Sequence, residues 1–499
     1  MDLTEIRSVL YPEIIVLIGI LLTLAMSLFN SSKKYVPGLA AIVLFTASIT
    51  AAMNFPSAES KTILFNSFNH DALSIYFRFL IYGASFLIVL GSSQYLKRLE
   101  SPSEYYPIML TASLGAGFLV SANDFLVFFV ALETLGLSAI LLASYARLNR
   151  GSNEAGIKYL INSAVATAVL LLGISMIYGL TASTNFNEVA MRIGQLAGSN
   201  LLSPSLLALI SICLVATIGF KLAAAPFHNW SPDVYTGAPT TTTVFLSVVS
   251  KVAALGFAIR LFHFVFLTQE MALLISVLAI LSIIIGNYVG VIQMISRGSV
   301  KRLLAYSSIA QAGYLLIGLA VFQGRSVAAL IMYLTVYALM NTGAFLALIY
   351  FEQTTGSDEI YDMSGLIKKR PGVVIAASLC LVNLAGLPFI PAGFIAKFYL
   401  FSSAYTSGLS FYGIDFGLVL ALVGLIGSLI GLFYYLYLIK IMVVDEPSTL
   451  VKQLDDKEPE GNCLVKLSLY LSVVLMAVIG IFGMDLLRGV ASTVLRALN

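Results

Sequence analysis

Four charged residues lie inside long apolar stretches of this chain: Glu133, Lys221, Lys251 and Lys397. A charge near the centre of a bilayer costs roughly 2.5–3.5 kcal/mol on insertion scales, so such residues usually face a bundle interior or a watery cavity. Glutamate and lysine side chains can both gain and lose a proton, and burial or a neighbouring charge changes how readily they do so. The four residues therefore predict a path for protons.

Glu133 and Lys221 are predicted to work as a pair. Glu133 is the deepest carboxylate of the chain, and a nearby ammonium group would tune its affinity for a proton. Lys221 and Lys251 would load and release protons, and Lys397 would connect the path to the far exit or to a neighbouring subunit. The alternatives are structural: a static ion pair between helices for Glu133, and snorkelling of long side chains towards the membrane surface for the lysines.

Other polar residues near these four are candidates for a proton relay. His228 could pass protons between Lys221 and Lys251, although a lone histidine more often has a structural role. Lys301 is a candidate for proton entry, with orientation of the protein as the alternative. A polar stripe at helical spacing suits a chain of waters, and equally suits the polar contacts that join membrane helices. The stripe consists of Ser307, Ser308, Gln311 and Tyr314.

The composition indicates an integral membrane protein. Hydrophobic residues make up 59% of the 499 residues and charged residues 11%, whereas soluble domains are about 25% charged. Cys213, Cys380 and Cys463 are far apart, so no disulfide framework, zinc site or iron–sulfur cluster is expected. No G-x-G-x-x-G after a strand and no G-x-x-x-x-G-K-[ST] loop occurs. We expect no cofactor in this chain, and energy must come from an ion gradient or another subunit.

Apolar runs recur along nearly the whole chain, enough for roughly 14 transmembrane helices at about 20 residues each. We therefore expect an all-α polytopic membrane protein. Pro226 and Pro232 interrupt the seventh helix, and Pro388, Pro391 and Gly393 interrupt the twelfth. Interruptions in corresponding segments of two halves indicate a transport pathway. The predicted helices cover residues 11–29, 37–54, 73–94, 105–121, 123–145, 156–181, 204–225, 240–263, 271–295, 299–321, 326–351, 373–404, 413–441 and 463–486.

The basic residues predict the orientation of these helices. Of the 28 lysines and arginines, 17 fall in one set of loops, 7 in the opposite set and 4 within spans, where Arg78 is close enough to a helix end to snorkel. The side with 17 should be cytoplasmic, which puts both termini outside. Helices 4–8 and 9–13 then run in opposite directions and form two inverted five-helix repeats. The single membrane domain divides into residues 1–104, 105–265, 266–441 and 442–499.

Four segments carry recognisable motifs: Glu154–Tyr159, Pro226–Pro239, Ser299–Tyr314 and Gly386–Lys397. They resemble the antiporter-like membrane subunits of respiratory complex I, and the resemblance covers essentially the whole chain. The Pro-Asp-Val-Tyr-x-Gly-Ala-Pro form is similar to the subunit N branch, whereas subunits L and M typically carry a Pro-Asp-Ala-His-like variant. Lys397 also resembles that branch, because subunit M has a glutamate there. Gln311 departs from the histidine of many relatives.

This resemblance implies two inverted repeats, with Glu133, Lys221, Lys251 and Lys397 on helices five, seven, eight and twelve as the residues that transfer protons. The implied function is proton translocation as one membrane-arm subunit of an NADH:quinone oxidoreductase. NADH, FMN, iron–sulfur clusters and a quinone, ubiquinone or menaquinone, would bind to partner subunits.

The partners implied by the resemblance are an antiporter-like neighbour, subunit M, small membrane subunits such as K and J, and the lipid bilayer; no nucleic acid is expected. The implied location is the plasma (inner) membrane of a bacterium. Three alternatives remain: a subunit of a multi-subunit cation/proton antiporter, a scaffold that does not pump, and the related quinone-reducing complexes of cyanobacteria and plastids.

Overall fold

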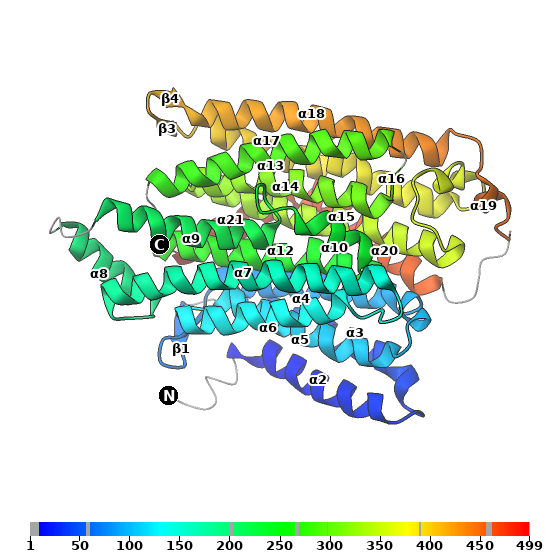
Figure 1. The fold of residues 1–499 in the computed structure, drawn as a ribbon, viewed down its shortest axis with the longest axis horizontal. Coiled ribbons are helices and arrows are strands. Elements are labelled where there is room, and N and C mark those ends of the chain that lie inside the picture. The colour runs from blue at the N-terminus through cyan, green and yellow to red at the C-terminus, as the bar shows by residue number, and fades with distance from the viewer. Residues whose placement is uncertain are drawn as a thin grey trace.

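A computed structural model describes residues 9–55, 60–198, 203–264, 269–296, 298–388, 391–455 and 462–498. Within these residues the chain is mostly helical, and the long helices lie side by side in one bundle (Figure 1). Arg7, Arg297 and Lys457, which contribute to the charge count above, lie outside the described residues.

The α-helices differ in length, from long spans to short pieces. The first half contains α2 (Tyr11–Leu28), α3 (Val36–Met53), α4 (Ala72–Ser92), α5 (Pro102–Ser121), α6 (Phe125–Ala143), α7 (Arg150–Thr181), α8 (Phe186–Gly198), α9 (Pro204–Leu222), α10 (Trp230–Gly237), α11 (Thr240–Ser247) and α12 (Val249–Phe264). The second half contains α13 (Gln269–Ile295), α14 (Val300–Val321), α15 (Gly324–Thr355), α16 (Pro371–Ala385), α17 (Pro391–Tyr405), α18 (Phe416–Val443), α19 (Thr449–Lys452), α20 (Cys463–Val478) and α21 (Met484–Leu498).

Twelve helical segments of the described chain are long and apolar enough to cross a membrane, judged by length and composition. The expected number was roughly 14. The difference lies in α5 and in the α16–α17 pair, which are outside the twelve. All three helices nevertheless pack against long neighbours, α5 against α6, and both α16 and α17 against α15 and α18.

Two antiparallel hairpins that the sequence analysis did not predict complete the fold. Strands β1 (Lys61–Ile63) and β2 (Phe68–His70) form one, and β3 (Ser410–Phe411) and β4 (Ile414–Asp415) form the other. Figure 1 shows β3 and β4 at the same end of the bundle as α8, with α19 at the opposite end.

The chain is interrupted where the prolines predicted. Helix α9 ends at Leu222 because Ala223 adopts a left-handed conformation, and α10 begins at Trp230. The interruption is anchored from both sides: Trp230 Nε1 donates to the carbonyl of Phe220 at 3.2 Å, and the N–H of Ala225 donates to Ser282 Oγ at 2.8 Å. The second interruption separates α16 from α17 and follows Gly386, whose φ is 84°.

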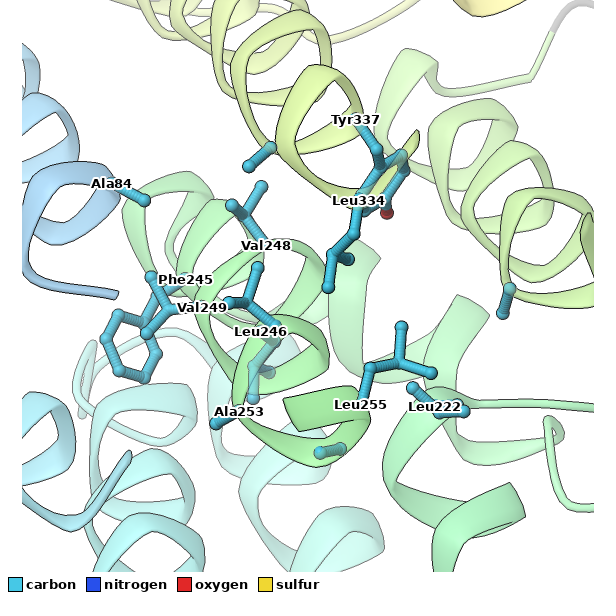
Figure 2. Packing of buried hydrophobic residues seen from close by; sticks show 14 of the residues in the cluster. Ala84, Leu222, Phe245, Leu246, Val248, Val249, Ala253, Leu255, Leu334 and Tyr337 are labelled. Carbon is cyan, nitrogen blue, oxygen red and sulfur yellow. The ribbon is translucent and has the colours of Figure 1, made fainter. Parts of the chain in front are cut away.

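The span predicted over 240–263 is present as one apolar segment, Thr240–Phe262, but its helix is interrupted at Val248. Helices α11 and α12 meet there, where φ and ψ are −111° and −71°. The carbonyl of Ser247 accepts a bond from Tyr337 Oη at 2.9 Å, and its Oγ accepts one from Asn341 at 3.0 Å. Figure 2 shows Val248 and Val249 between Ala84 of α4 on one side and Leu334 and Tyr337 of α15 on the other.

Two arginines lie buried against carboxylates, so Arg78 does not snorkel, although its place near a helix end would allow it. Arg78 forms a 3.2 Å ion pair with Glu13 of α2, and Arg260 makes two 2.8 Å bonds to Asp71, which also caps α4. Arg260 therefore belongs to the interior of α12 and not to a loop. Arg78 also bonds to His70 Nδ1; burial and this guanidinium lower the pKa of His70 to about 4.

Candidate functional site

Glu133 of α6 and Lys221 of α9 lie near each other without a salt bridge between them. Lys221 Nζ is buried and has no hydrogen-bond partner in the part of the chain that the structure describes, whereas Glu133 Oε1 accepts a 2.6 Å bond from Thr167 of α7. The ammonium group lies beside Gly136, where a Cβ would stand only 3.2 Å from Nζ. Glu133 and Gly136 are three residues apart and share a face of α6. A glycine thus makes room for the lysine one turn from the carboxylate.

Lys221 occupies the last turn of α9, just before the interruption. The carboxyl end of a helix carries a partial negative charge, which favours a cation there. Phe220 and Trp230 flank this turn, and Tyr159 of α7 stacks on Trp230 with ring centroids 4.7 Å apart. The interrupted helix therefore places an ammonium group next to its own carbonyl end and aromatic rings around it.

Lys251 lies in the first turn of α12, three residues after the joint at Val248. Its Nζ donates 2.6 Å bonds to both the carbonyl and the Oγ of Ser308 on α14. Ser308 Oγ is also 3.2 Å from Tyr337 Oη, which in turn donates to the carbonyl of Ser247 at 2.9 Å. The joint and the lysine thus belong to one hydrogen-bonded group that links α11, α12, α14 and α15.

Lys397 of α17 shares an acceptor with Gln311 of α14. Its Nζ donates to the carbonyls of Leu384 and Ala385 at 2.8 and 3.4 Å, and to Ser428 Oγ at 3.1 Å. Gln311 Nε2 donates to the same Leu384 carbonyl at 3.1 Å. These carbonyls are the last of α16, freed by the break after Ala385. The second interruption therefore supplies backbone acceptors for a lysine, which the first does not do for Lys221.

The polar stripe of α14 joins these lysine sites. Ser308 contacts Lys251, Gln311 contacts the acceptor of Lys397, and the Tyr314 ring lies 4.8 Å from Lys397 Nζ. Ser307 pairs with Tyr435 of α18 through their hydroxyl groups. The stripe predicted from helical spacing is thus entirely buried and runs from one lysine to the other.

Sequence reasoning missed the facing residues. Tyr333 donates to Gln311, and Tyr337 and Asn341 hold the α11–α12 joint. These three residues follow one another at four-residue steps on α15, so a search for a second polar stripe could have found them. The Leu384 acceptor could not have been found in this way, because a backbone carbonyl cannot be recognised from the residue type.

Of the remaining candidates, His228 makes no hydrogen bond to Lys221 or Lys251. Lys301 forms a 3.2 Å ion pair with the buried Glu352 of α15, whose other oxygen accepts a 2.7 Å bond from Thr240. This pair lines a cavity of about 230 Å³ at the end of the bundle away from Lys397. Sequence reasoning missed Glu352 because it lies in the last turn of its helix, where an acid is ordinarily solvated.

Among the described residues, no group of three or more His, Cys, Asp or Glu side chains is close enough to hold a metal ion. Cys213 and Cys380 are buried and free, and Cys463 is exposed and free.

Residues 122–454 match a family described as NADH:quinone oxidoreductase/Mrp antiporter, TM. This chain belongs to that family. Glu133, Lys221, Lys251 and Lys397 all lie inside the matched range. Among curated members, NAD(P)H-quinone oxidoreductase subunit 2 of Synechococcus sp. (strain JA-3-3Ab) is 39% identical over 484 residues, which cover 95% of this chain and 88% of that protein. The protein of the same name from Gloeobacter violaceus is 38% identical over 504 residues, covering 99% and 94%.

Chains of three solved complexes share the fold. A chain of respiratory complex I from Thermus thermophilus, solved with bound aureothin, superposes with a TM-score of 0.77 at 26% identity and covers 96% of this chain and 99% of that one. A chain of the archaeal membrane-bound sulfane sulfur reductase superposes at 0.82, with 21% identity, covering 100% and 98%. A chain of the Mrp complex from Dietzia sp. DQ12-45-1b superposes at 0.83, also with 21% identity, covering 99% and 52%. The last two likenesses concern the fold alone.

Proposed function

We propose that this chain translocates protons as the N-type membrane-arm subunit of an NADH:quinone oxidoreductase. The observation that carries the proposal is that Lys221, Lys251 and Lys397 are all buried inside the bundle of a member of the antiporter-like family, and that the polar stripe of α14 contacts Lys251 and the acceptor of Lys397. Placing lysines inside a membrane bundle costs free energy, and such residues usually mark the path of an ion or a proton.

In the proposed mechanism, Glu133 and Lys221 receive the energy input. A charge or conformational change in a neighbouring subunit alters the distance between them, and the unpartnered Lys221 ammonium is free to respond. Lys251 then relays the proton through the centre, and Lys397 passes it to the outer exit or to the neighbouring subunit. Electron transfer from NADH through FMN and iron–sulfur clusters to quinone takes place in partner subunits.

The proposed architecture completes the expected set of spans. If α5 and the α16–α17 pair each cross the membrane once, they add two crossings to the 12 long segments. The two five-helix repeats would then be inverted, with one interrupted helix in each. The chain would be a multi-pass protein of a bacterial plasma membrane with both termini outside, next to an antiporter-like neighbour and small membrane subunits.

The test is purification of the chain with its native assembly, followed by measurement of proton uptake in vesicles. We expect flavin- and iron–sulfur-containing subunits to co-purify, and quinone reduction by NADH to drive proton movement. Sodium-dependent proton exchange without quinone reduction would instead identify a cation/proton antiporter. An unchanged proton-to-electron ratio in a variant with Lys221, Lys251 and Lys397 all replaced by alanine would identify a scaffold.

A further inference from the structure

A cavity of about 370 Å³ lies between α15, α17 and α21, and neither Lys251 nor Lys397 lines it. Its size falls in the range of ligand pockets, about 300–1,000 Å³. Two arginines line it, Arg325 from the first turn of α15 and Arg488 from the first turns of α21. We propose that this cavity binds the phosphate group of an anionic phospholipid.

The two guanidinium groups give the cavity its chemistry. Arginine presents planar, permanently charged donors that match the geometry of phosphate oxygens. Arg488 is oriented by the Tyr399 ring, with Cζ 4.6 Å from the ring centroid. Its only carboxylate partner in the described chain is Asp485, 3.8 Å away and nearly fully exposed, which is a weak competitor. Arg325 has no carboxylate partner among the described residues, and the amino end of α15 adds further positive potential.

The remaining walls suit a headgroup followed by acyl chains. Ser402 and Ser403 of α17 line the cavity, as does Thr406 just after its end, and each hydroxyl donates to a carbonyl of α17 at 2.8–3.1 Å. Each can turn its proton towards a phosphate oxygen in exchange for one such bond. Ala329 and Met332 supply an apolar side. A free anion has no use for this apolar side, whereas a lipid does.

The position of the cavity in the bundle fits the headgroup level of a bilayer. Arg325 is the second residue of α15, and Thr406 directly follows the end of α17, so the cavity lies where these apolar helices reach the β3–β4 end of the molecule. Arginines at helix ends commonly interact with lipid headgroups there. The site is separate from the proposed proton path, because Lys397 contacts α16 and α18 and not the cavity.

The proposal can be tested with photoreactive phosphatidylglycerol in nanodiscs that hold the intact assembly. We expect crosslinks to peptides that contain Ser402 or Arg488. The Arg325→Gln/Arg488→Gln double variant should crosslink at least tenfold less. Arg147→Gln removes an exposed arginine at the opposite end of the bundle and should crosslink like wild type. Ala329→Leu, which fills the cavity and keeps both arginines, should also reduce crosslinking.

Competition identifies the source of the phosphate. Unlabelled phosphatidylglycerol should suppress the crosslink, and inorganic phosphate at about 10 mM should not. All samples are kept at the same ionic strength, so that charge screening is equal in each. Suppression by inorganic phosphate would overturn the lipid assignment. Equal crosslinking of wild type and the double variant, or no crosslink within the cavity peptides, would overturn the site. Neither arginine belongs to the proposed proton path, so quinone reductase activity should remain unchanged in the double variant. This activity is the control that the assembly is intact.

Discussion

The three buried lysines differ in what surrounds their ammonium groups. Lys221 has no hydrogen-bond partner, Lys251 binds the carbonyl and hydroxyl of one serine, and Lys397 binds two carbonyls, a hydroxyl and an aromatic face. A charged group without a partner is the most sensitive to a neighbouring charge. At the scale of single residues, we therefore expect that, in the proposed mechanism, Lys221 responds most strongly to a change of charge nearby and that Lys251 and Lys397 respond less.

Glu133→Gln removes the carboxylate that stands one turn from the Lys221 ammonium group. We expect proton pumping per electron to fall at least about tenfold in an assembled complex, since a positioned proton acceptor typically contributes 10²–10⁴. Glu270→Gln, at an exposed position of α13, is the matched control and should pump normally. Near-normal pumping by the Glu133 variant would rule out its gating role.

Lys251→Ala should abolish pumping because the α12–α14 contact through Ser308 loses its titrating group. Lys251→Arg keeps a positive charge but holds its proton, since arginine stays protonated, so pumping should remain at least tenfold below wild type. Ser308→Ala removes only the Oγ bond and leaves the carbonyl acceptor, so its loss should be smaller. Wild-type pumping by the arginine variant would identify Lys251 as structural.

His70 should make folding stability depend on pH at the edge of the bundle. Its pKa is about 4 in the folded protein, lowered by burial and by Arg78, against 6.5 when unfolded. The unfolded state therefore binds a proton that the folded state excludes, and stability should fall as pH drops from 6.5 towards 4. Thermal denaturation at several pH values should show this slope, and His70→Gln should flatten it. An identical slope in the variant would contradict the assignment.

At the scale of helices, Gly136 of α6 leaves room for the side chain of Lys221 from α9. Gly136→Ala would put a Cβ 3.2 Å from Lys221 Nζ, so the ammonium group must shift by a few tenths of an ångström. We expect pumping to fall a few-fold while the fold is kept, because alanine favours a helix over glycine by about 1 kcal/mol. Gly179→Ala on α7 meets nothing within 4 Å and is the matched control. Equal pumping by both variants would show that this spacing does not matter.

The helices also show which features a sequence can predict. Prolines and Gly386 mark the interruptions of α9 and α16, and the spacing of the α14 stripe gives its buried face. No glycine or proline marks the joint at Val248 in the sequence. The joint is held instead by hydrogen bonds from Tyr337 and Asn341 of another helix to Ser247. Likewise, nothing next to Arg78 in the sequence reveals Glu13. Contacts between distant helices, and acceptors supplied by the backbone, are therefore what sequence reasoning missed.

At the scale of the molecule, the charge asymmetry predicts which end of the bundle faces the cytoplasm. In a Cys463→Ser background, which removes the exposed native thiol, two single variants report on the two ends. Tyr412→Cys lies in the β3–β4 turn and Leu148→Cys between α6 and α7, where the native residues are 93% and 85% exposed.

Membrane-impermeant maleimide added outside intact cells should label the Tyr412→Cys variant alone. In inverted vesicles the same reagent should label the Leu148→Cys variant alone, because the basic loops face the cytoplasm. Labelling in the reverse pattern would invert the orientation, and with it the direction assigned to the path through Lys397.

The carbonyl of Leu384 has a consequence for how signals cross the second half of the molecule. A Grotthuss chain needs every member both to accept and to release a proton, and a peptide carbonyl flanked by the amide of Gln311 does neither. This contact can therefore transmit only electrical polarisation between α14 and Lys397, while the proton itself must take another route. Gain of charge on Lys397 would strengthen its hydrogen bond to the carbonyl and weaken the one from Gln311. The shared carbonyl would therefore pass a change of charge from Lys397 to α14 without passing a proton.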